Sequence, residues 1–362
     1  MNVPFLNLDR EAATLIGLGL MADIEEVVRS GRFLFGPKAT ELEIRLSEMF
    51  GREVVLVGSG TDALALSLKA IGVGPGDLVA VPAISAIPTA VAVHMTGAEP
   101  LYIDVDGGFT MDPRALERVA SYPRLKAVVP VHLYGNPAEI GKIRVICCAN
   151  RLLLVEDCAQ SLGAHSHELP LGTLGSAGAL SFYPTKNLGC MGDGGAVVAC
   201  DKNLAQAIRE LRFYGQETGH RMGRFIGMNS RMDEIQCAVL LKKLQLLPAQ
   251  FGRRTEMKTM YDEAVAGTRF WTPGWREGAM PHLYPIAAED RAKTVAALAE
   301  KGVETAIHYP FHLMEAVEGH PGAGELSQAK MYVSKVLSLP FNPWMTDDEI
   351  KHVLQSVKEV SE

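Results

Sequence analysis

The sequence predicts an α/β fold: a large domain with a mostly parallel seven-stranded sheet, followed by a smaller C-terminal α+β domain. Short apolar runs recur through the first two-thirds of the chain, and segments with helical spacing lie between several of them. After about residue 250 this alternation gives way to a different pattern. Strands that alternate with helices are typical of an open parallel sheet that binds ligands at the carboxyl ends of its strands.

Seven short apolar runs are interpreted as strands buried on both faces of the sheet. They are residues 54–57, 78–83, 100–105, 125–131, 152–156, 179–183 and 196–200. Helical spacing occurs at residues 62–72, 112–122 and 138–151. A further long helical stretch begins near Arg231, and we expect Pro248 to break or bend it.

The C-terminal third is expected to contribute a strand, a helix, a second strand and a last helix. These elements correspond to residues 282–287, 289–302, 303–310 and 347–360. Thr346 and Glu349 have the spacing of a capping box, which marks the start of the last helix. The predicted domains are therefore residues 1–247 and residues 248–362.

The composition excludes several classes of protein. The 362 residues are 48% hydrophobic and 21% charged, so the chain can bury a large core. The net charge is −7 and no long basic run occurs, so we expect no nucleic-acid binding. No stretch of 18 apolar residues and no basic flank of a signal peptide are present, which favours a soluble cytoplasmic protein without membrane contacts.

The sequence lacks the short motifs of several common enzyme classes. Its six cysteines show no C-x-x-C spacing, which indicates reduced thiols rather than a disulfide framework. The motifs G-x-S-x-G, H-E-x-x-H, G-x-x-x-x-G-K-[ST] and G-x-G-x-x-G are absent. Hydrolase, zinc-protease, P-loop and standard dinucleotide-binding functions therefore lose support, and we expect no metal site.

Lys186 is the first candidate for chemistry. It lies between two predicted strands, in a segment with four glycines on its C-terminal side. A loop lysine ordinarily extends its charge to the surface. Glycine-rich backbone, however, lets another group approach closely, and a desolvated lysine can attack a carbonyl as a neutral amine.

Asp157 and the turn Ser59–Thr61 are the second and third candidates. Asp157 follows a buried strand, so its carboxylate either caps the next segment or faces the ligand edge of the sheet. The turn joins an apolar strand to a helix, whose first N–H groups can bind an anion. Amine, carboxylate and anion site together match the aldehyde, the ring nitrogen and the phosphate of pyridoxal phosphate.

Six motifs extend this interpretation to a known family. GSGTDAL, PVHLYG, VEDCAQ, SFYPTKNLG, GDGGAVV and NSRMDEIQ occur in this order. With them the chain resembles the DegT/StrS family of pyridoxal-phosphate-dependent sugar aminotransferases of fold type I. The resemblance extends from VPFLNL near the N-terminus to LSLPFNPWMTDDEI near the C-terminus. It implies that residues 1–247 form the cofactor-binding domain.

The resemblance also implies a role for each candidate residue. Lys186 holds the cofactor as a Schiff base and moves a proton between the cofactor and the substrate carbon. Asp157 faces the pyridine nitrogen, and Gln160 faces the ring hydroxyl. Gly60, Thr61 and Ser181 bind the phosphate, together with Asn229 of a second subunit, and the turn described above adds Ser59 to this group. A homodimer with shared active sites follows.

In such enzymes glutamate or glutamine donates the amine, and a keto sugar linked to a nucleoside diphosphate accepts it. We expect a 3-keto or 4-keto deoxyhexose, and the form of SFYPTKNLG favours the 3-keto type. Tyr183, His308 and Tyr309 are candidates for substrate contacts, with core packing as the alternative for each. The family commonly has a cofactor-stacking aromatic residue where this chain has Ala86, so Ile84, Ile87 or a displaced side chain is expected to cover the ring.

Two other functions remain open. One is an aminotransferase for an unlinked cyclic ketone of the inosose type, as in antibiotic pathways. The other is a regulatory protein that binds the cofactor without turnover, which only Ala86 supports. Related sugar dehydratases use a histidine in place of the lysine, and Lys186 argues against that activity.

Overall fold

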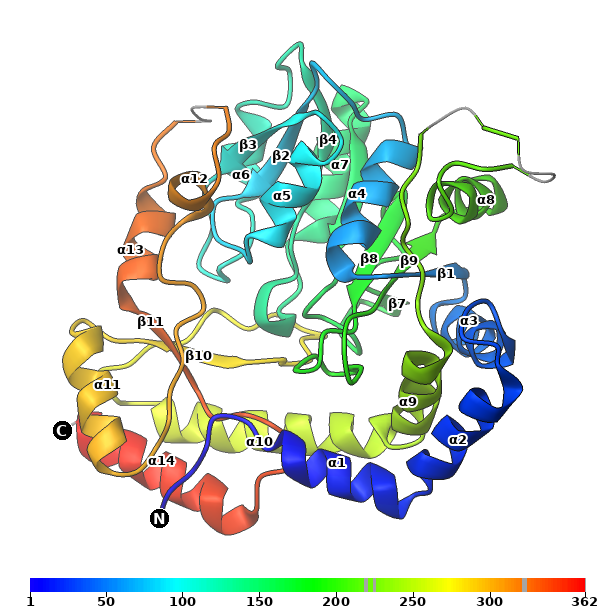
Figure 1. The fold of residues 1–362 in the computed structure, drawn as a ribbon. Helices are drawn as coiled ribbons and strands as arrows, with labels where there is room; N and C mark the ends of the chain where they lie inside the picture. Colours follow the sequence, from blue (N-terminus) through cyan, green and yellow to red (C-terminus); the bar gives the residue numbers. More distant parts are fainter. Residues whose placement is uncertain (218–220, 224–225, 321–323, 362) are drawn as a thin grey trace.

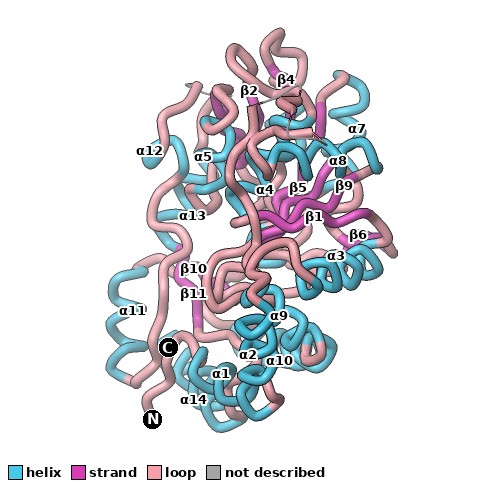
Figure 2. The backbone as a smooth tube through the Cα atoms, turned by 45° about the vertical axis from the view of Figure 1, so that its right-hand side comes forward, coloured by secondary structure: helices cyan, strands magenta, loops and turns pink. Residues whose placement is uncertain are grey.

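The computed structural model describes residues 1–217, 221–223, 226–320 and 324–361. Figure 1 shows the main sheet and its flanking helices in the upper part of the molecule, above a group of helices that includes α10 (Leu247–Val265) and α14 (Asp347–Ser361). Both termini lie beside this lower group. Turning the molecule by 45° keeps the small β10–β11 sheet, formed by Tyr284–Ala287 and Val336–Leu339, apart from the main sheet (Figure 2).

The main sheet of the described residues has seven strands in the order β1-β9-β8-β5-β4-β2-β3. The strands are β1 Glu53–Val57, β2 Leu78–Pro82, β3 Glu99–Ile103, β4 Leu125–Val128, β5 Leu153–Asp157, β8 Ala177–Ser181 and β9 Gly195–Ala199. A short hairpin, β6 His165–Ser166 and β7 Leu169–Pro170, stands apart. Only β9 pairs antiparallel with its neighbours, β1 and β8. The predicted mostly parallel seven-stranded sheet is confirmed.

The strands are almost continuously apolar because both faces of the sheet are covered. Along β1, Val55 and Val57 pack into one core, and Val54 and Leu56 pack into the core on the opposite face. This alternation is the period of two that an extended chain imposes on its side chains. Helices α4 (Gly60–Ala70), α5 (Pro88–His94) and α8 (Lys202–Leu211) contribute to the first core. Helices α3 (Pro37–Phe50), α6 (Pro113–Glu117), α7 (Ile140–Asn150) and α9 (Glu234–Leu244) contribute to the second.

The helices of the described residues confirm some predicted bounds and correct others. They are α1 Leu8–Gly17, α2 Leu20–Ser30, α3 Pro37–Phe50, α4 Gly60–Ala70, α5 Pro88–His94, α6 Pro113–Glu117, α7 Ile140–Asn150, α8 Lys202–Leu211, α9 Glu234–Leu244, α10, α11 Arg291–Glu300, α12 Leu313–Ala316, α13 Ser327–Lys335 and α14. The helix expected at 112–122 already ends at Glu117. The predicted break of the helical stretch near Pro248 is confirmed: α9 ends at Leu244, and Pro248 lies in the first turn of α10, where its missing N–H costs nothing.

The C-terminal unit has its own core, to which α10, α11, α14 and both strands of the small sheet contribute. The capping box is present: the amide of Glu349 donates to Thr346 Oγ1 at 3.2 Å, and the amide of Thr346 donates to Glu349 Oε2 at 2.8 Å. Val3 packs into this core as well. The predicted domain boundary after residue 247 falls at the start of α10 and stays a prediction.

The strand expected at residues 303–310 is wrong. This segment pairs with β11 only at Ala306, which exchanges two backbone hydrogen bonds with Ser338. Beyond that point the side chains of His308 and Tyr309 contact Ser338 and Gln160. The partner of β10 is instead β11, in antiparallel register.

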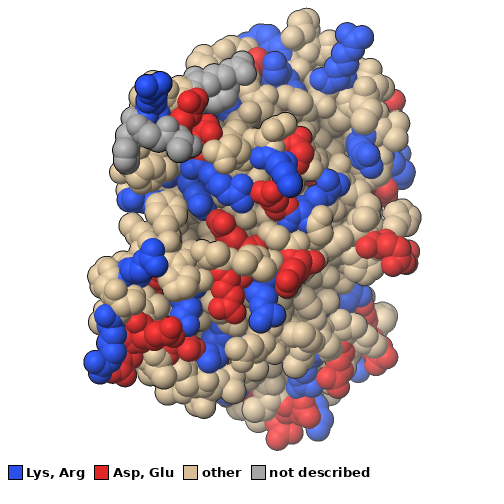
Figure 3. Space-filling model, turned by 90° about the vertical axis from the view of Figure 1, so that its right-hand side faces the viewer, with Lys and Arg blue, Asp and Glu red and all other residues tan. Residues whose placement is uncertain are grey.

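Among the described residues, no helix combines the length and the apolar character needed to cross a bilayer. Figure 3 shows one face of the molecule, on which basic and acidic side chains are interspersed.

Candidate active site

A cavity of about 510 Å³ lies between the carboxyl ends of β5 and β8, the N-terminus of α4 and segments of the C-terminal unit. Ten of the residues predicted from the sequence line it: Ser59, Gly60, Thr61, Asp157, Gln160, Ser181, Tyr183, Lys186, His308 and Tyr309. Residues that are more than 200 positions apart in the chain therefore line one cavity.

Lys186 lies in the turn that follows β8, where its amide donates to the carbonyl of Tyr183 at 2.9 Å. Gly189 lets this turn fold back, because a Cβ there would lie 2.4 Å from the carbonyl oxygen of Pro184. Burial lowers the pKa of the Lys186 amine to about 8, and the nearby charge of Asp157 partly opposes this effect. The structure thus provides a desolvated amine that is neutral in roughly a tenth of the molecules at pH 7, far more often than an ordinary lysine.

Asp157 ends β5 and is only 3% exposed. Its Oδ2 accepts a hydrogen bond from Thr89 Oγ1 at 2.8 Å, and its Oδ1 accepts one from the amide of Ala159 at 3.1 Å. Burial raises the pKa of Asp157, while these two donors and Lys186 act in the opposite direction. A carboxylate with two donors in a buried site can accept a further charged hydrogen bond, which a protonated ring nitrogen provides.

The N-terminus of α4 forms the anion-binding end of the cavity. Ser59 caps the helix, because its hydroxyl accepts a hydrogen bond from the amide of Asp62 at 3.1 Å. The amides of Gly60 and Thr61 lie in the first turn, where no helical partner exists, and they have no hydrogen-bond partner among the described residues. A Cβ at position 60 would lie 2.6 Å from Ser181 Cβ, so glycine is what lets Ser181 reach this turn.

Gln160 and Tyr309 connect the sheet to the C-terminal unit. Gln160 Oε1 accepts from the amide of Tyr134 at 2.8 Å, and its Nε2 donates to the Tyr309 hydroxyl at 2.9 Å. Tyr134 in turn donates its hydroxyl to the carbonyl of His308. Burial raises the pKa of Tyr309 to about 12, so this phenol stays protonated. The side chain of Gln160 therefore makes two contacts within the protein and positions Tyr309 at the cavity wall.

Two sequence expectations concern the edges of the cavity. Asn229 is exposed and is not among the described lining residues of this single chain. Its neighbour Ser230 fixes the segment next to α4, since its hydroxyl accepts from the amide of Gly58 at 2.9 Å. Ala86 does line the cavity, whereas Ile84 and Ile87 are not among the described lining residues.

The sequence analysis did not identify every lining residue, and three of those it missed carry buried polar side chains near the predicted site: Thr89, Arg254 and His282. Thr89 is the hydroxyl donor to Asp157, and it lies 68 positions away in the chain. Arg254 and His282 belong to the C-terminal third, where no motif marked them. Only their shared burial in the folded chain identifies them as part of the site.

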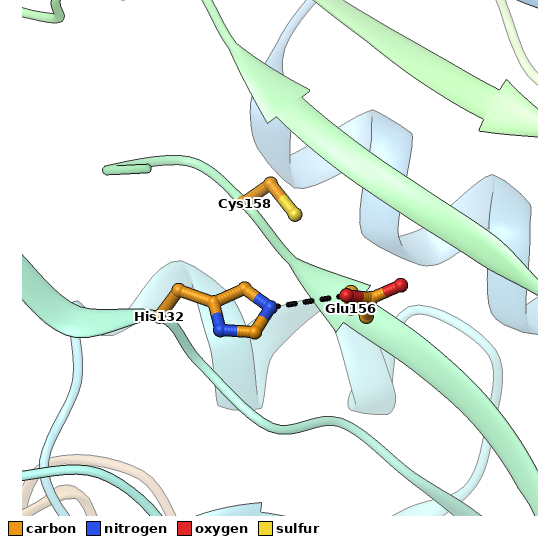
Figure 4. A group of neighbouring side chains, drawn as sticks. All are labelled: His132, Glu156 and Cys158. Carbon is orange, nitrogen blue, oxygen red and sulfur yellow. Dashed lines mark hydrogen bonds and ion pairs between the residues drawn. The ribbon is translucent and has the colours of Figure 1, made fainter. Parts of the chain in front are cut away.

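A second group of polar side chains, His132, Glu156 and Cys158, lies close to the site and could suggest a metal centre (Figure 4). Its donor atoms are already used. His132 Nδ1 accepts from the amide of Ala138 at 3.0 Å, so the proton is on Nε2, which donates to Glu156 Oε2 at 3.2 Å. Burial keeps the pKa of the Cys158 thiol well above its usual value, so sulfur stays protonated. The group acts as a structural hydrogen-bond cluster.

Comparisons with known proteins agree with this geometry. The sequence profile of the DegT/DnrJ/EryC1/StrS aminotransferase family matches residues 16–358. The erythromycin biosynthesis sensory transduction protein EryC1 of Saccharopolyspora erythraea is 40% identical over 372 residues, 99% of each chain. The dTDP-3-amino-3,4,6-trideoxy-alpha-D-glucose transaminase of Streptomyces venezuelae is 38% identical, with 99% of this chain and 96% of that protein aligned.

Among solved structures, NtdA from Bacillus subtilis with bound cofactor PMP superposes with a TM-score of 0.90. It is 31% identical, and the superposition covers 99% of this chain and 85% of that chain. The expected fold type I architecture is confirmed by this likeness. The buried amine, the carboxylate with two donors and the open amides of α4 also fit such a cofactor, because each offers what one of its functional groups requires.

Proposed function

Because the chain belongs to the DegT/DnrJ/EryC1/StrS family and is a pyridoxal-phosphate-dependent aminotransferase, we propose that it transfers the amino group of glutamate or glutamine to a keto sugar. The acceptor is a 3-keto or 4-keto deoxyhexose linked to a nucleoside diphosphate, and the product serves amino-sugar biosynthesis. The observation that carries the proposal is the placement of Lys186 and Asp157 in one buried cavity with the N-terminus of α4.

When bound, the cofactor supplies an electron sink for the substrate carbon that loses or gains a proton. Lys186 supplies the amine that holds the cofactor, and it then acts as the base and acid that moves this proton at Nζ. A lowered pKa suits both tasks, since the amine has to lose and regain its proton at the same pH.

Asp157 keeps the ring nitrogen protonated, because a carboxylate buried beside it stabilises the positive charge. Thr89 and Ala159 hold the carboxylate in place by their hydrogen bonds. Gln160 faces the ring hydroxyl in our proposal, while its amide also keeps Tyr309 at the cavity wall.

Ser59, Gly60, Thr61 and Ser181 bind the phosphate through the helix N-terminus and their hydroxyl groups. We assign the remaining phosphate contact to the partner subunit's Asn229, so that the working enzyme is a homodimer with two shared sites. Mixing Lys186→Ala subunits with Asn229→Ala subunits tests this assignment. A hybrid dimer contains one site with both residues intact, so activity should reappear on subunit exchange. Exchange without recovery would contradict the shared site.

The substrate side of the cavity supports a sugar acceptor. Tyr183, His308 and Tyr309 offer aromatic surface and polar atoms at its wall, as sugar rings require. A relative that is 38% identical carries the name of a dTDP-3-amino sugar transaminase, which favours the 3-keto position. We therefore expect the new amine at C3.

A regulatory function is the second candidate, because the relative with 40% identity is named a sensory transduction protein. The two functions differ in what glutamate does to the purified protein. An aminotransferase converts the absorption band of its lysine-bound cofactor into that of the amine form, whereas a sensor binds the cofactor without this conversion.

The decisive experiment offers the amine form of the protein a panel of acceptors and identifies the products by mass spectrometry. The panel contains nucleotide-linked 3-keto and 4-keto deoxyhexoses and free inososes. Amination of a nucleotide-linked 3-keto sugar supports the proposal. Amination of free inososes alone would overturn the choice of acceptor, and failure of glutamate and glutamine to convert the cofactor would favour the regulatory function.

A further inference from the structure

Arg254 on α10 is a buried guanidinium on the wall of the active-site cavity. It is 5% exposed, and its Nη1 donates to the carbonyls of Pro281 and His282 at 3.2 and 3.3 Å. Among the described residues it forms no ion pair, Nε has no hydrogen-bond partner, and none is recorded for Nη2. Burial lowers the pKa of Arg254 to about 10, a value at which the group keeps its charge at neutral pH. The charge of Glu11 partly opposes this effect, but Glu11 forms its ion pair with Lys243 Nζ at 2.8 Å. Arg254 thus has no recorded ion-pair partner of its own, and a buried cation in this state is costly.

His282 adds a second polar group with unmet hydrogen bonds to the same wall. It is also 5% exposed, and its amide donates to the carbonyl of Tyr134 at 2.8 Å, which fixes the backbone. Its Nδ1 is buried without a partner, and no hydrogen bond of its Nε2 is recorded among the described residues. Burial, together with the charges of Lys186 and Arg254, holds the pKa of His282 well below its usual value. The neutral ring can therefore still donate one hydrogen bond.

The acidic groups of the cavity do not neutralise this wall. Asp157 and Asp193 are the carboxylates among the described lining residues. Asp157 is hydrogen-bonded to Thr89 and Ala159 and is needed for the ring nitrogen, and Asp193 is exposed to solvent. The positive charge of Arg254 is therefore not neutralised by a lining residue, and an anionic group of a ligand can neutralise it.

We propose that Arg254 and His282 form a carboxylate-binding subsite that takes a carboxylate of the amino donor. The inference rests on the proposed function and deepens it, since it identifies residues that select glutamate or glutamine. A carboxylate suits the site because a guanidinium presents planar N–H groups to it, and because the phosphate of the cofactor already has its own site at α4. A single enclosed cation also matches one small anion better than a diphosphate.

Glutarate is a suitable probe, since it has the two carboxylates of the donor but no amine or keto group that reacts. Isothermal titration calorimetry of the holoenzyme should show glutarate binding that weakens at least tenfold in Arg254→Lys and several-fold in His282→Gln. Arg253→Lys is the matched control: Arg253 is the next residue on α10 but pairs with Glu256 and Asp347, so glutarate affinity should not change.

Two further ligands test whether the anion bound by Arg254 is a carboxylate of the amino donor, a sugar carboxylate or a diphosphate. UDP-glucuronate carries a sugar carboxylate and UDP-glucose does not. For each of these nucleotides, the affinity of Arg254→Lys should equal that of the wild type. Selective loss of UDP-glucuronate would assign the subsite to an acidic sugar and overturn our proposal. Equal weakening of both nucleotides would assign Arg254 to the diphosphate, with the same consequence. Unchanged glutarate affinity in Arg254→Lys, with the cofactor absorption intact, would also overturn it.

Steady-state kinetics give an independent reading. In Arg254→Lys the KM for glutamate should rise at least tenfold, while kcat and the KM for the keto sugar change less than threefold. Circular dichroism and the cofactor band report folding, and His282→Gln carries the test if Arg254→Lys does not fold. If glutarate binding depends on Arg254 but the protein aminates no sugar, the carboxylate subsite is supported and the proposed sugar acceptor is rejected. If the protein aminates the sugar but its KM for glutamate does not depend on Arg254, the acceptor is supported and the subsite is rejected.

Discussion

Glu156 and Asp157 are adjacent carboxylates on β5 that face opposite sides of the sheet, and their surroundings differ sharply. Glu156 is fully buried and accepts four hydrogen bonds, from His132 and from the amides of Gly172, Leu174 and Gly175. Asp157 accepts two hydrogen bonds and faces the cavity that contains Lys186.

This difference shows how to distinguish a carboxylate that stabilises the fold from one that is available to a ligand. A carboxylate whose lone pairs are all used stabilises the loop that supplies its donors, and it has nothing left to offer a ligand. A buried carboxylate with few donors is costly unless a ligand completes its contacts. Burial alone does not make the distinction, because both residues are buried.

Lys186→Ala should have the largest effect on the Asp157 side. Removal of the amine takes away both the covalent attachment of the cofactor and the group that moves the proton, so turnover should fall by about 10⁴-fold or more. Borohydride should fix the cofactor to the wild type and not to the variant, as mass spectrometry can show. Folding should be unaffected, because no hydrogen bond or ion pair of the Lys186 amine is recorded among the described residues. A variant that retains a lysine-bound cofactor would contradict the assignment.

Asp157→Asn sharpens the comparison, since it keeps the shape of the side chain and removes only the negative charge. We expect turnover to fall by about 10² to 10³-fold, because the neutral amide no longer stabilises a protonated ring nitrogen. The apoprotein should lose no stability, because burial already disfavours the carboxylate. Single-turnover kinetics with glutamate and urea unfolding of the apoprotein measure the two effects. Turnover equal to that of the wild type would remove the proposed role of Asp157.

The sequence predicted the main sheet well because burial on both faces forces each strand to be a continuous apolar run. The position of Asp157 at a strand end identified it as a candidate, whereas Ser181 was indicated only by the resemblance to the family; both line the cavity. The sequence did not indicate Thr89, since hydrogen bonding to a residue 68 positions away leaves no local pattern. The error at residues 303–310 has a similar origin, because contacts of His308 and Tyr309 replace strand pairing there.

Glu156→Gln is the counterpart on the structural side. The amide group turns a donor toward at least one of the four N–H groups that Glu156 now accepts, which leaves buried donors without partners. We expect unfolding to require about 2–4 kcal/mol less free energy, with kcat within about threefold of the wild type. Urea unfolding and initial rates measure both quantities. A variant of normal stability that has lost activity would show that the two sides of β5 are not separate in function.

The pH dependence of cofactor uptake provides a further test of the Asp157 side. A lysine whose pKa is about 8 is neutral in roughly a tenth of the molecules at pH 7, whereas an ordinary lysine is neutral in about 0.03%. The rate at which the apoprotein takes up pyridoxal phosphate should therefore rise about tenfold from pH 7 to a plateau above pH 9, as followed by absorbance. Glu156→Gln should show the same midpoint.

The same lowered pKa fixes the sign of the effect on stability. Between pH 8 and about 10.5 the unfolded chain still holds the proton of Lys186, while the folded apoprotein has lost it. The unfolded state then binds more protons, so the stability of the apoprotein increases with pH through this window. In the uptake experiment described above, a midpoint near pH 10 instead of pH 8 would show that the Lys186 amine is hydrated, and it would contradict the lowered pKa.

Thr89→Val should produce the smallest of these effects and tests how Asp157 is held. Valine preserves the shape of threonine but removes the hydroxyl that donates to Asp157 Oδ2 at 2.8 Å. One remaining donor, the amide of Ala159, then holds the carboxylate, so its pKa should rise further and kcat should fall by roughly five- to tenfold, equivalent to about 1 kcal/mol. Ser85→Ala is the control, since Ser85 contacts the Thr89 hydroxyl at 2.8 Å but not Asp157, and its effect should be smaller. A larger loss in Ser85→Ala than in Thr89→Val would mean that Ser85, rather than the bond to Asp157, is the contact that matters.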